Sequence, residues 1–539
     1  MSGADVFATI GDVACEPVAN TGPKEGADFT YIDIGSVDRE AKVIIDAKTL
    51  SASEAPSRAR QVLRADDVLV SMTRPNLNAV ARVPASLDGA IGSTGFHVLR
   101  SQWMEPGFLH YLVQTTNFVD AMCNVVQGAL YPAVRPADIA KFSFRLPPRA
   151  EQTRIVEKLE ELLGSLDAAV AELKAAQRKL THYRQSLLKA AMEGALTEAW
   201  RSSPSPCPRS GQGEVGRGSL LPSDKSTPPQ PSPSPSAKGR EQETGTDLLH
   251  RILQERRTRW EEKQQAKFAQ TGKTPPKGWQ AKYPEPVAPD TTDLPALPEG
   301  WVWASLDALV ADSSYGTSAK CGYGNNGTPV LRIPNVSGGD LDLRDMKFSD
   351  GPLPLTAEDF LDIGDVLVIR TNGSIGLVGR AAAVTAPLPA PHYFASYLLR
   401  LRCVNRTVLH HWISTFLASP IGRRWIEERA ASSAGQHNVS LSTLLTMPVP
   451  LPPLEEQTEI LTTLDTQLSA AKEQEIAITH SLHQTAAQRR NLLRAAFSGQ
   501  LVPQDPNDEP ASELLARIRA AKTESASKTK PAMQRKRKA

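Results

Sequence analysis

The stretch Pro450–Leu461 reads PLPPLEEQTEIL, and it nearly repeats Arg145–Val156, which reads RLPPRAEQTRIV. In both stretches, Leu-Pro-Pro precedes a Glu-Gln-Thr triplet, and apolar residues at helical spacing follow. Proline forces the residue before it out of the α region, so the chain enters each segment extended and a helix starts just afterwards. The repeat therefore predicts two helices that begin in the same way.

The two segments keep one register behind the motif. Gln152 matches Gln457, a shift of 305 positions, and the same shift still pairs Gly194 with Gly499. No gap is needed, which is typical of a continuous helix because an insertion would rotate one face away. Glycine is suited to a helix C-cap. We therefore predict two helices of about forty residues, each roughly 60 Å long.

The first predicted helix carries apolar residues at alternating steps of four and three, the period of a coiled-coil seam. These residues are Ile155, Leu159, Leu162, Leu166, Ala169, Leu173, Ala176, Leu180, Tyr183 and Leu187. In the second helix, polar residues interrupt the series. Each helix could pack on its own globular half, but a narrow stripe over many turns favours a partner helix. We expect the two helices to pair antiparallel, with a pseudo-two-fold axis relating the halves.

The regions before the helices match more loosely. LRADDVLVSMTRPN (Leu63–Asn76) is similar to DIGDVLVIRTNGS (Asp362–Ser374), and FLHYLVQT (Phe108–Thr115) is similar to VLHHWIST (Val408–Thr415). Short alternating strands and short helices predict an α+β domain in each half. The fold expected is thus two globular α+β domains separated by a long antiparallel two-helix coiled coil.

These observations divide the chain into six parts. We predict a first domain at 1–147, a long helix at 148–199, a Pro/Ser-rich linker at 200–297 with a charged helix near 247–270, a second domain at 298–450, a second long helix at 451–500, and a basic, largely disordered tail at 501–539.

Bulk properties exclude several classes of protein. No stretch approaches eighteen uninterrupted apolar residues, and the N-terminus lacks a basic region followed by an apolar core. A membrane span and a secretory signal are therefore not expected. The five cysteines are scattered, which fits a reducing cytoplasm. The net charge of +2 means that nucleic-acid binding would depend on local basic patches.

The sequence contains no catalytic constellation that we could identify. A phosphate-binding loop, a Rossmann glycine motif, a His-Glu-x-x-His zinc motif and a Gly-x-Ser-x-Gly elbow are missing. The Asn-Pro-Pro-Tyr or Asp-Pro-Pro-Tyr motif of amino-methyltransferases is missing as well. His410 and His411 are more readily explained as a packed or surface pair than as metal ligands. We predict that this chain is not itself an enzyme.

Polar loops occupy matching places in the two halves. They are TRPNLN (Thr73–Asn78) and TNGSIG (Thr371–Gly376) after the repeated strand, and Val126–Ile139 and Ser433–Leu444 before each Leu-Pro-Pro. Such side chains can bind phosphates and base edges. They are also common in ordinary turns for backbone reasons. The recurrence in both halves keeps the binding interpretation open beside the structural one.

Taken together, these features resemble the specificity subunit of type I restriction-modification enzymes. The resemblance rests on the doubled Leu-Pro-Pro-x-x-Glu-Gln motif, on the helix ends KAAMEGAL and RAAFSGQL, and on LPEGWVWASL (Leu297–Leu306) opening the second half. It covers nearly the whole chain. The Pro/Ser-rich insert and the weak second seam depart from the simpler family pattern.

The resemblance implies that each domain is a target-recognition domain reading one half of a bipartite site in double-stranded DNA. It implies two modification (methyltransferase) subunits and restriction (translocase and nuclease) subunits as cytoplasmic partners. S-adenosylmethionine, ATP and Mg²⁺ would be used by those partners, with no cofactor or metal in this chain and no membrane association. The DNA-binding candidates in the polar loops are Thr73, Arg74, Asn76, Arg135, Thr371, Asn372, Ser374, Gln436, His437 and Asn438.

Two other functions remain to be weighed. The chain could be a non-enzymatic coiled-coil scaffold whose paired domains bind protein. It could also be a solitary methyltransferase-nuclease fusion, but the missing methylation motifs count against that interpretation.

Overall fold

A computed structural model describes residues 5–14, 16–126, 132–202, 243–324 and 326–529. The chain forms two compact units. The first unit comprises residues 1–177 and 476–539, and the second comprises residues 178–475. Both long helices therefore contribute to both units.

The first unit contains an α+β domain. Its sheets have the strand orders β5-β2-β9-β6, β10-β7-β8, β1-β11 and β3-β4. The strands are β1 Phe7–Thr9, β2 Asp28–Ile32, β3 Val37–Asp38, β4 Val43–Ile44, β5 Lys48–Ser51, β6 Ala59–Val62, β7 Val68–Ser71, β8 Val80–Arg82, β9 Ile91–Ser93, β10 Phe96–Leu99 and β11 Ser143–Arg145. The helices of the domain are α1 Ile10–Val13, α2 Pro106–Leu112, α3 Thr116–Asn124 and α4 Pro136–Ala140, and a 3-10 turn, η3, spans Pro75–Leu77.

The second unit contains a domain of the same kind. Its sheets have the orders β13-β21-β17-β19, β14-β16-β15-β20, β18-β23-β22 and β12-β24. The strands are β12 Val302–Ser305, β13 Val310–Tyr315, β14 Cys321–Gly322, β15 Pro329–Leu331, β16 Lys347–Ser349, β17 Asp365–Ile369, β18 Thr371–Asn372, β19 Ala381–Ala383, β20 Tyr393–Phe394, β21 Leu398–Cys403, β22 Ala431–Ser433, β23 Gln436–Asn438 and β24 Pro448–Leu451. The helices are α8 Leu306–Leu309, α9 Ile333–Val336, α10 Leu409–Ala418, α11 Pro420–Arg429 and α12 Leu441–Leu445.

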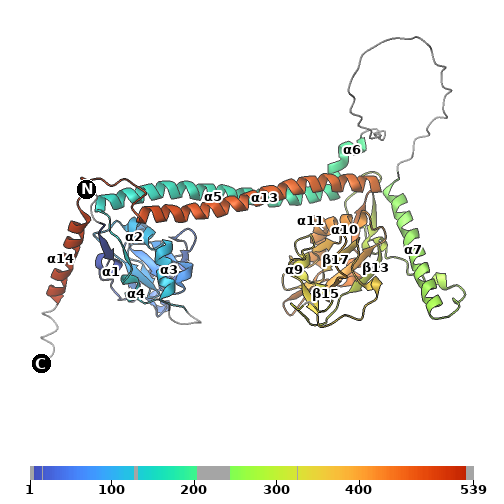
Figure 1. The fold of residues 1–539 in the computed structure, drawn as a ribbon, viewed down its shortest axis with the longest axis horizontal. Coiled ribbons are helices and arrows are strands. Elements are labelled where there is room, and N and C mark those ends of the chain that lie inside the picture. Colours follow the sequence, from blue (N-terminus) through green and yellow to red (C-terminus); the bar gives the residue numbers. More distant parts are fainter. Residues whose placement is uncertain (1–4, 15, 127–131, 203–242, 325, 530–539) are drawn as a thin grey trace, which may run out of the picture. The chain divides into compact units, whose positions relative to one another are not determined.

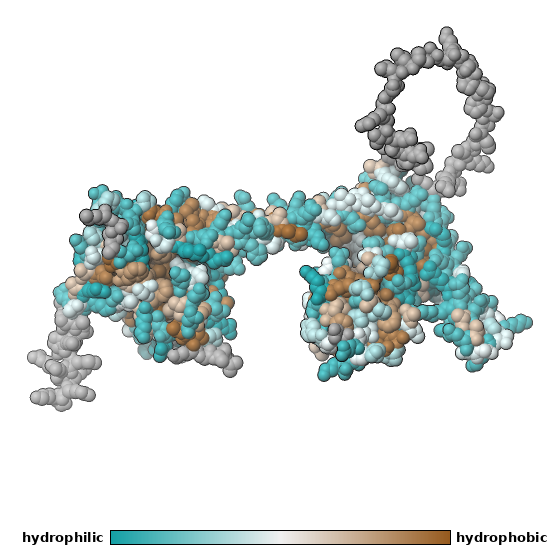
Figure 2. Space-filling model, viewed as in Figure 1, coloured by the Kyte–Doolittle hydropathy of each residue, from teal (hydrophilic) through white to brown (hydrophobic). Residues whose placement is uncertain are grey.

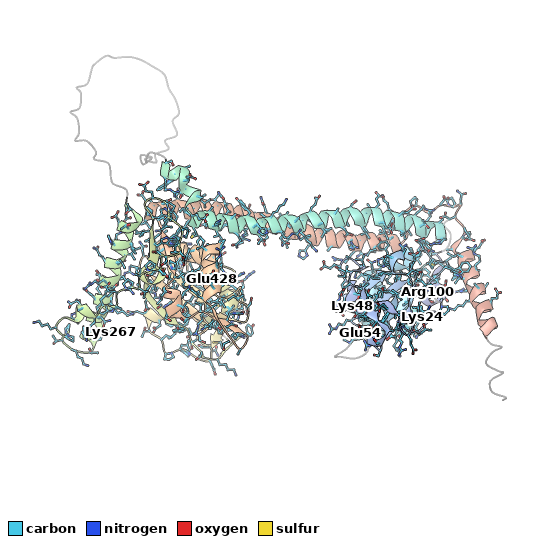
Figure 3. The ribbon with its side chains drawn as sticks, turned by 180° about the vertical axis from the view of Figure 1, so that it is seen from behind. Lys24, Lys48, Glu54, Arg100, Lys267 and Glu428 are labelled. Carbon is cyan, nitrogen blue, oxygen red and sulfur yellow. The ribbon has the colours of Figure 1, made fainter. Side chains whose placement is uncertain are left out.

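The two domains share their topology. A fully buried central strand, β7 or β17, lies between antiparallel neighbours β10 and β8 or β21 and β19. The parallel pair β2-β9 recurs as β15-β20. The same buried ion pair braces both central strands: Arg100 to Asp67 at 2.6 Å and Arg402 to Asp365 at 2.7 Å. Figure 3 shows Arg100 within the body of the first domain. The internal repeat and the α+β class are thus confirmed.

The two predicted long helices are α5 (Arg149–Met192) and α13 (Leu454–Phe497), each of 44 residues. They run side by side and antiparallel within each unit (Figure 1). In the first unit Arg489 forms an ion pair with Asp167, and in the second Arg184 forms one with Glu475. Gly194 and Gly499, just beyond the helices, have positive φ, as expected of C-cap glycines. None of the described helices is long and apolar enough to cross a bilayer.

The seam between the helices is less regular than its sequence predicts. Ile155, Leu159 and Leu187 are buried, but Ala169 is exposed and Tyr183 is 46% exposed. An uninterrupted seam is therefore the wrong prediction at these two positions. A straight α-helix drifts against a 3.5-residue repeat. The helix ends also pack on the domains, since Ile155 and Leu159 share one core with Phe108.

The Leu-Pro-Pro motif joins a strand to a helix in each unit. β11 ends just before the first motif, β24 ends at the leucine of the second, and these strands pair with β1 and β12. The side-chain amide of Gln152 is fully buried and donates to the Pro147 carbonyl at 2.9 Å, and Gln457 donates to Pro452 at 2.8 Å. The glutamine therefore ties the first turn of the helix to the proline step and gives a partner to a carbonyl that lies before the helix.

The predicted charged helix is α7 (Gly245–Gln270), which packs on the second domain. Leu248 and Ile252 enter the core of the second unit, and the Gly245 N–H donates to the Gly300 carbonyl at 2.6 Å. The visible surface over α7 is mainly hydrophilic (Figure 2). Most of the Pro/Ser-rich stretch, residues 203–242, lies outside the described residues.

The prediction of a largely disordered tail is wrong for Ala511–Thr529, which form α14. Leu514, Leu515 and Ile518 are buried in the core of the first unit. The stretch Ser512–Ile518 (SELLARI) repeats Thr246–Ile252 (TDLLHRI) of α7. In each case an arginine of the helix also forms an ion pair with a glutamate just before the helix, Arg517 with Glu509 and Arg251 with Glu243. This short repeat lies outside the register that relates the two long helices. The internal duplication therefore extends to the helices that follow them in the chain.

Candidate nucleic-acid interface

In the first unit, the loop after β7 lies against the segment that precedes α4. Thr73 forms an antiparallel bridge with Ala133, and the Arg74 N–H donates to the Pro132 carbonyl at 2.8 Å. Two loops that the sequence singled out separately are therefore one surface. Residues 127–131, part of the second of these loops, lie outside the described residues.

Arg74 opens this loop in a left-handed backbone conformation, with φ of 49°. Such a conformation costs roughly 1–3 kcal/mol in a non-glycine residue and clusters at functional sites. Its side chain is exposed, as is that of Asn76, and no ion pair of Arg74 occurs among the described residues. Thr73 and Arg74 line a hollow of about 280 Å³ that also includes Arg39. Sequence reasoning missed Arg39, because it comes from a different hairpin.

Arg135 is positioned differently from Arg74. Its side chain is 64% exposed, and its guanidinium binds both carboxylate oxygens of Asp138, at 3.1 and 3.2 Å. The side-chain hydrogen bonds to Arg135 lower the pKa of Asp138. To bind a base, Arg135 would therefore have to break its bidentate pair with Asp138.

Lys42 supports the other end of the loop. Its ammonium donates to the Asn78 carbonyl at 2.5 Å, and Asn78 has a φ of 44°. Burial and the nearby Arg489 lower the pKa of Lys42 to about 8. Lys42 is a second residue that sequence reasoning missed, because only the folded chain brings it to the loop.

In the second unit, the candidates lie on the small sheet β18-β23-β22. Thr371 pairs with Asn438 and Asn372 with His437 in an antiparallel register. The Asn372 side chain accepts the Ser374 N–H at 2.8 Å. The structure therefore gathers all six candidates of this half, Thr371, Asn372, Ser374, Gln436, His437 and Asn438, on one polar surface.

A hairpin joins β22 to β23 through Ala434 and Gly435. Both have positive φ, as in a type I′ turn, which brings the exposed Gln436 directly after the turn. Arg370 donates to the Asn438 side chain at 3.3 Å and stacks on Tyr315, with 4.9 Å between the guanidinium carbon and the ring centroid. Tyr315 is 45% exposed. Arg370 and Tyr315 thus extend the candidate surface beyond the predicted residues.

The two surfaces occupy equivalent places but differ in chemistry. Thr73 and Thr371 are equivalent by the shift of the central strand, and Ala133 and Asn438 by the shift of the Leu-Pro-Pro motif. Among the predicted residues, the first surface presents two arginines beside a threonine and an asparagine, whereas the second presents amides, hydroxyls and an imidazole, with Arg370 next to them. Among the described residues, no cluster of three or more histidine, cysteine, aspartate or glutamate side chains is arranged to hold a metal ion.

Comparison with known proteins supports the resemblance. The family model described as "Type I restriction modification DNA specificity domain" matches residues 313–479. The StySPI specificity subunit of Salmonella potsdam is 20% identical over 485 residues, covering 87% of this chain and 83% of that protein. The EcoKI specificity subunit of Escherichia coli K12 is 22% identical, covering 78% of this chain and 73% of that protein.

A solved structure from work on complex assembly and conformational transition of the type I R-M system has the same fold. It aligns with a TM-score of 0.61 at 23% identity and covers 92% of this chain and 98% of that chain. The family model, the relatives matched over most of their length and the shared fold agree with the doubled motif. The chain is therefore similar, over most of its length, to the specificity subunits of type I restriction-modification enzymes.

Proposed function

We propose that this chain is the non-catalytic DNA-specificity subunit of a type I restriction-modification complex, and that it binds a bipartite, asymmetric site in double-stranded DNA. One observation carries the proposal. In both domains the segment after the central strand meets the segment before Leu-Pro-Pro in an exposed polar surface, through Thr73 with Ala133 and through Thr371 with Asn438.

The difference in chemistry between the surfaces accounts for an asymmetric site. Arginine is suited to guanine, and asparagine and glutamine are suited to adenine. The Arg74 surface and the Asn372–Gln436 surface would therefore prefer different bases. Thr73, Arg74, Asn76 and Arg135 would act on one half-site, and Thr371, Asn372, Ser374, Gln436, His437 and Asn438 on the other.

Catalysis would come from partner subunits. We propose two modification subunits that methylate adenine with S-adenosylmethionine, and restriction subunits that use ATP and Mg²⁺, all in the cytoplasm. This chain would bind DNA, orient it and set the spacing of the half-sites. Direct DNA contacts would fall into backbone-positioning and base-reading classes.

The test is methylated-base mapping of a host that expresses this chain with its modification subunit. We expect a bipartite adenine-methylation motif with a fixed spacer. Replacing the second domain with that of a relative should change one half-site and leave the other unchanged. Both half-sites changing together would contradict two independent readers. Random or absent methylation, beside an active modification subunit, would favour the scaffold interpretation.

A further inference from the structure

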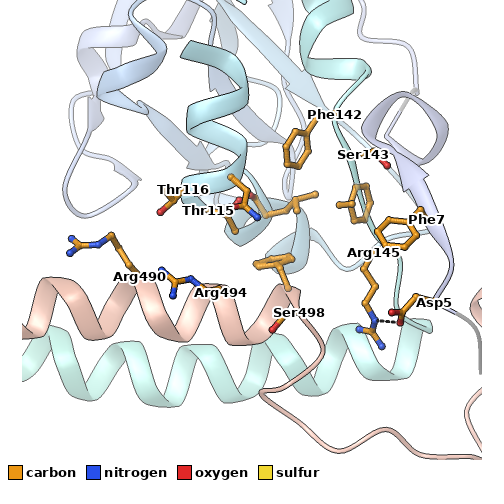
Figure 4. A pocket seen from close by; sticks show the side chains of 14 residues that line it. Asp5, Phe7, Thr115, Thr116, Phe142, Ser143, Arg145, Arg490, Arg494 and Ser498 are labelled. Carbon is orange, nitrogen blue, oxygen red and sulfur yellow. Dashed lines mark hydrogen bonds and ion pairs between the residues drawn. The ribbon is translucent and has the colours of Figure 1, made fainter. Parts of the chain in front are cut away.

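A pocket of about 310 Å³ lies in the first unit between α13 and the first domain (Figure 4). Arg490 and Arg494, one helical turn apart on α13, line this pocket together with Thr115 and Thr116 at the start of α3. The pocket shares no lining residue with the hollow beside Arg74. It is therefore a separate site from the candidate DNA interface.

The pocket carries free positive charge. Arg490 and Arg494 are exposed, and neither makes an ion pair or a side-chain hydrogen bond within the part of the chain that the structure describes. Arg145, a third guanidinium in the wall, is already held by Asp5 and Glu151, each at 2.9 Å. Two adjacent unpaired guanidinium groups favour a carboxylate or phosphate oxygen pair.

The pocket also has an apolar wall, formed by Phe7, Phe142, Phe144 and Phe497. Phe7 is 60% exposed, an unusual position for a large aromatic side chain. A ligand that covers this wall must bring an apolar group beside its anionic group. A polypeptide with an acidic residue next to an apolar side chain fits both requirements, whereas a DNA backbone supplies only the anion.

The second half does not reproduce this charge. By the shift of 305, Arg490 corresponds to Gln185 and Arg494 to Lys189. Gln185 is neutral, and Lys189 lies 3.8 Å from Glu193 on the same helix. Any partner that binds both pseudo-equivalent surfaces would therefore meet two arginines at one of them and one partly neutralised lysine at the other.

We propose that this pocket docks an acidic, apolar-flanked segment of a modification subunit, with its carboxylate between Arg490 and Arg494. The identity of the partner rests on the proposed function, whereas the ligand class rests on the pocket. Because the second half lacks the paired arginines, the two modification subunits bind with unequal affinity. The copy at the first domain binds more tightly and with the steeper dependence on salt.

The test compares assembly of the full-length chain with its modification subunit. Native mass spectrometry and titration calorimetry would give the affinity of each of the two copies at 50 and 300 mM NaCl. For Arg490→Gln/Arg494→Gln we expect the tighter affinity to fall at least tenfold and its salt dependence to flatten. Arg490→Lys/Arg494→Lys should keep part of the affinity, because charge remains while the bidentate geometry is lost. Lys189→Gln removes charge from the equivalent surface and should change neither affinity more than twofold.

Three results would overturn the proposal. The first is wild-type affinity of both copies for the Arg490→Gln/Arg494→Gln chain. The second is an equal loss at both copies. The third is weaker DNA binding by the variant chain without partner, with assembly unchanged, because it would assign the pocket to a DNA phosphate. Methylated-base mapping of the wild-type complex tests the specificity function separately from docking in the pocket. A missing methylation motif would contradict the specificity function, but the comparison of affinities would still test the pocket.

Discussion

The indole N–H of Trp301 donates to the carboxylate of Glu456 at 2.8 Å, across 155 residues of sequence. Glu456 is buried in the first turn of α13 and also accepts hydrogen bonds from Thr197 at 2.7 Å and from Arg201. One carboxylate thus joins the segment that follows the first long helix, the entry to the second domain and the start of the second long helix.

Glu456→Ala should destabilise the second unit by about 3 kcal/mol, because it leaves the Arg201 guanidinium and the Trp301 N–H without their shared acceptor. Urea unfolding followed by tryptophan fluorescence measures this change. Glu455→Ala is the matched control, since Glu455 is the adjacent, exposed carboxylate. It should stay within about 0.5 kcal/mol of the wild type. Equal effects of the two substitutions would contradict the role assigned to Glu456.

Arg74 and Arg135 provide a second comparison within one surface. Arg74→Ala should weaken DNA binding by about 1–3 kcal/mol and relax one half-site, because its guanidinium is free to bind a base. Arg135→Ala should cost less, because Arg135 already binds Asp138. Fluorescence anisotropy with the specific site and with a site mutated in one half measures both effects. A larger loss for Arg135→Ala would reverse the assignment.

α14 should be required for the stability of the first domain. Leu514→Ala and Ile518→Ala each remove a side chain that is less than 4% exposed, and each should cost about 2–5 kcal/mol. α14 packs against α1, and the Lys522 ammonium donates to the Gly11 carbonyl of α1 at 2.8 Å. Loosening α14 should therefore increase hydrogen exchange in α1. Ala516→Ser, at an exposed position of the same helix, serves as the control. Unchanged exchange in α1 would show that α14 is dispensable.

The sequence predicted the elements that local chemistry determines. Leu-Pro-Pro dictates an extended step before a helix, and the constant register of Gln152 and Gln457 predicted two matched helices, as α5 and α13 confirm. The repeated strand predicted β7 and β17 with their following loops. These features depend on spacing within a few turns or strands, which a sequence displays directly.

Features that depend on distant parts of the chain were not predictable in the same way. Arg39 and Lys42 reach the Thr73–Asn78 loop from another hairpin, and Arg370 reaches Asn438 only because β18 pairs with β23. α14 escaped prediction because its apolar positions are few and lie among alanines and charges. The exposure of Tyr183 depends on how two helices drift past each other.

The equivalent histidines His110 and His410 predict a dependence of stability on pH. Burial lowers the pKa of each imidazole to about 4; Arg82, Lys42 and Arg489 add to the effect at His110, and His411 adds to it at His410. Nδ1 of each is buried without a hydrogen-bond partner among the described residues. Unfolding returns the pKa to its ordinary value near 6.5, so the unfolded chain binds protons first as the pH falls. Stability is therefore complete above pH 6.5 and decreases toward pH 4.

His110→Leu and His410→Leu should each remove about 1 kcal/mol of the loss between pH 7.5 and pH 5.5. The measurement is the free energy of unfolding from urea titrations at the two pH values, with wild type and variants compared as differences. Carboxylates that titrate in the same range cancel in that comparison. His182→Leu, at an exposed position of α5, should leave the pH dependence unchanged. If the His110→Leu and His410→Leu chains lose as much stability as the wild type, the buried imidazoles are not the groups that respond to pH.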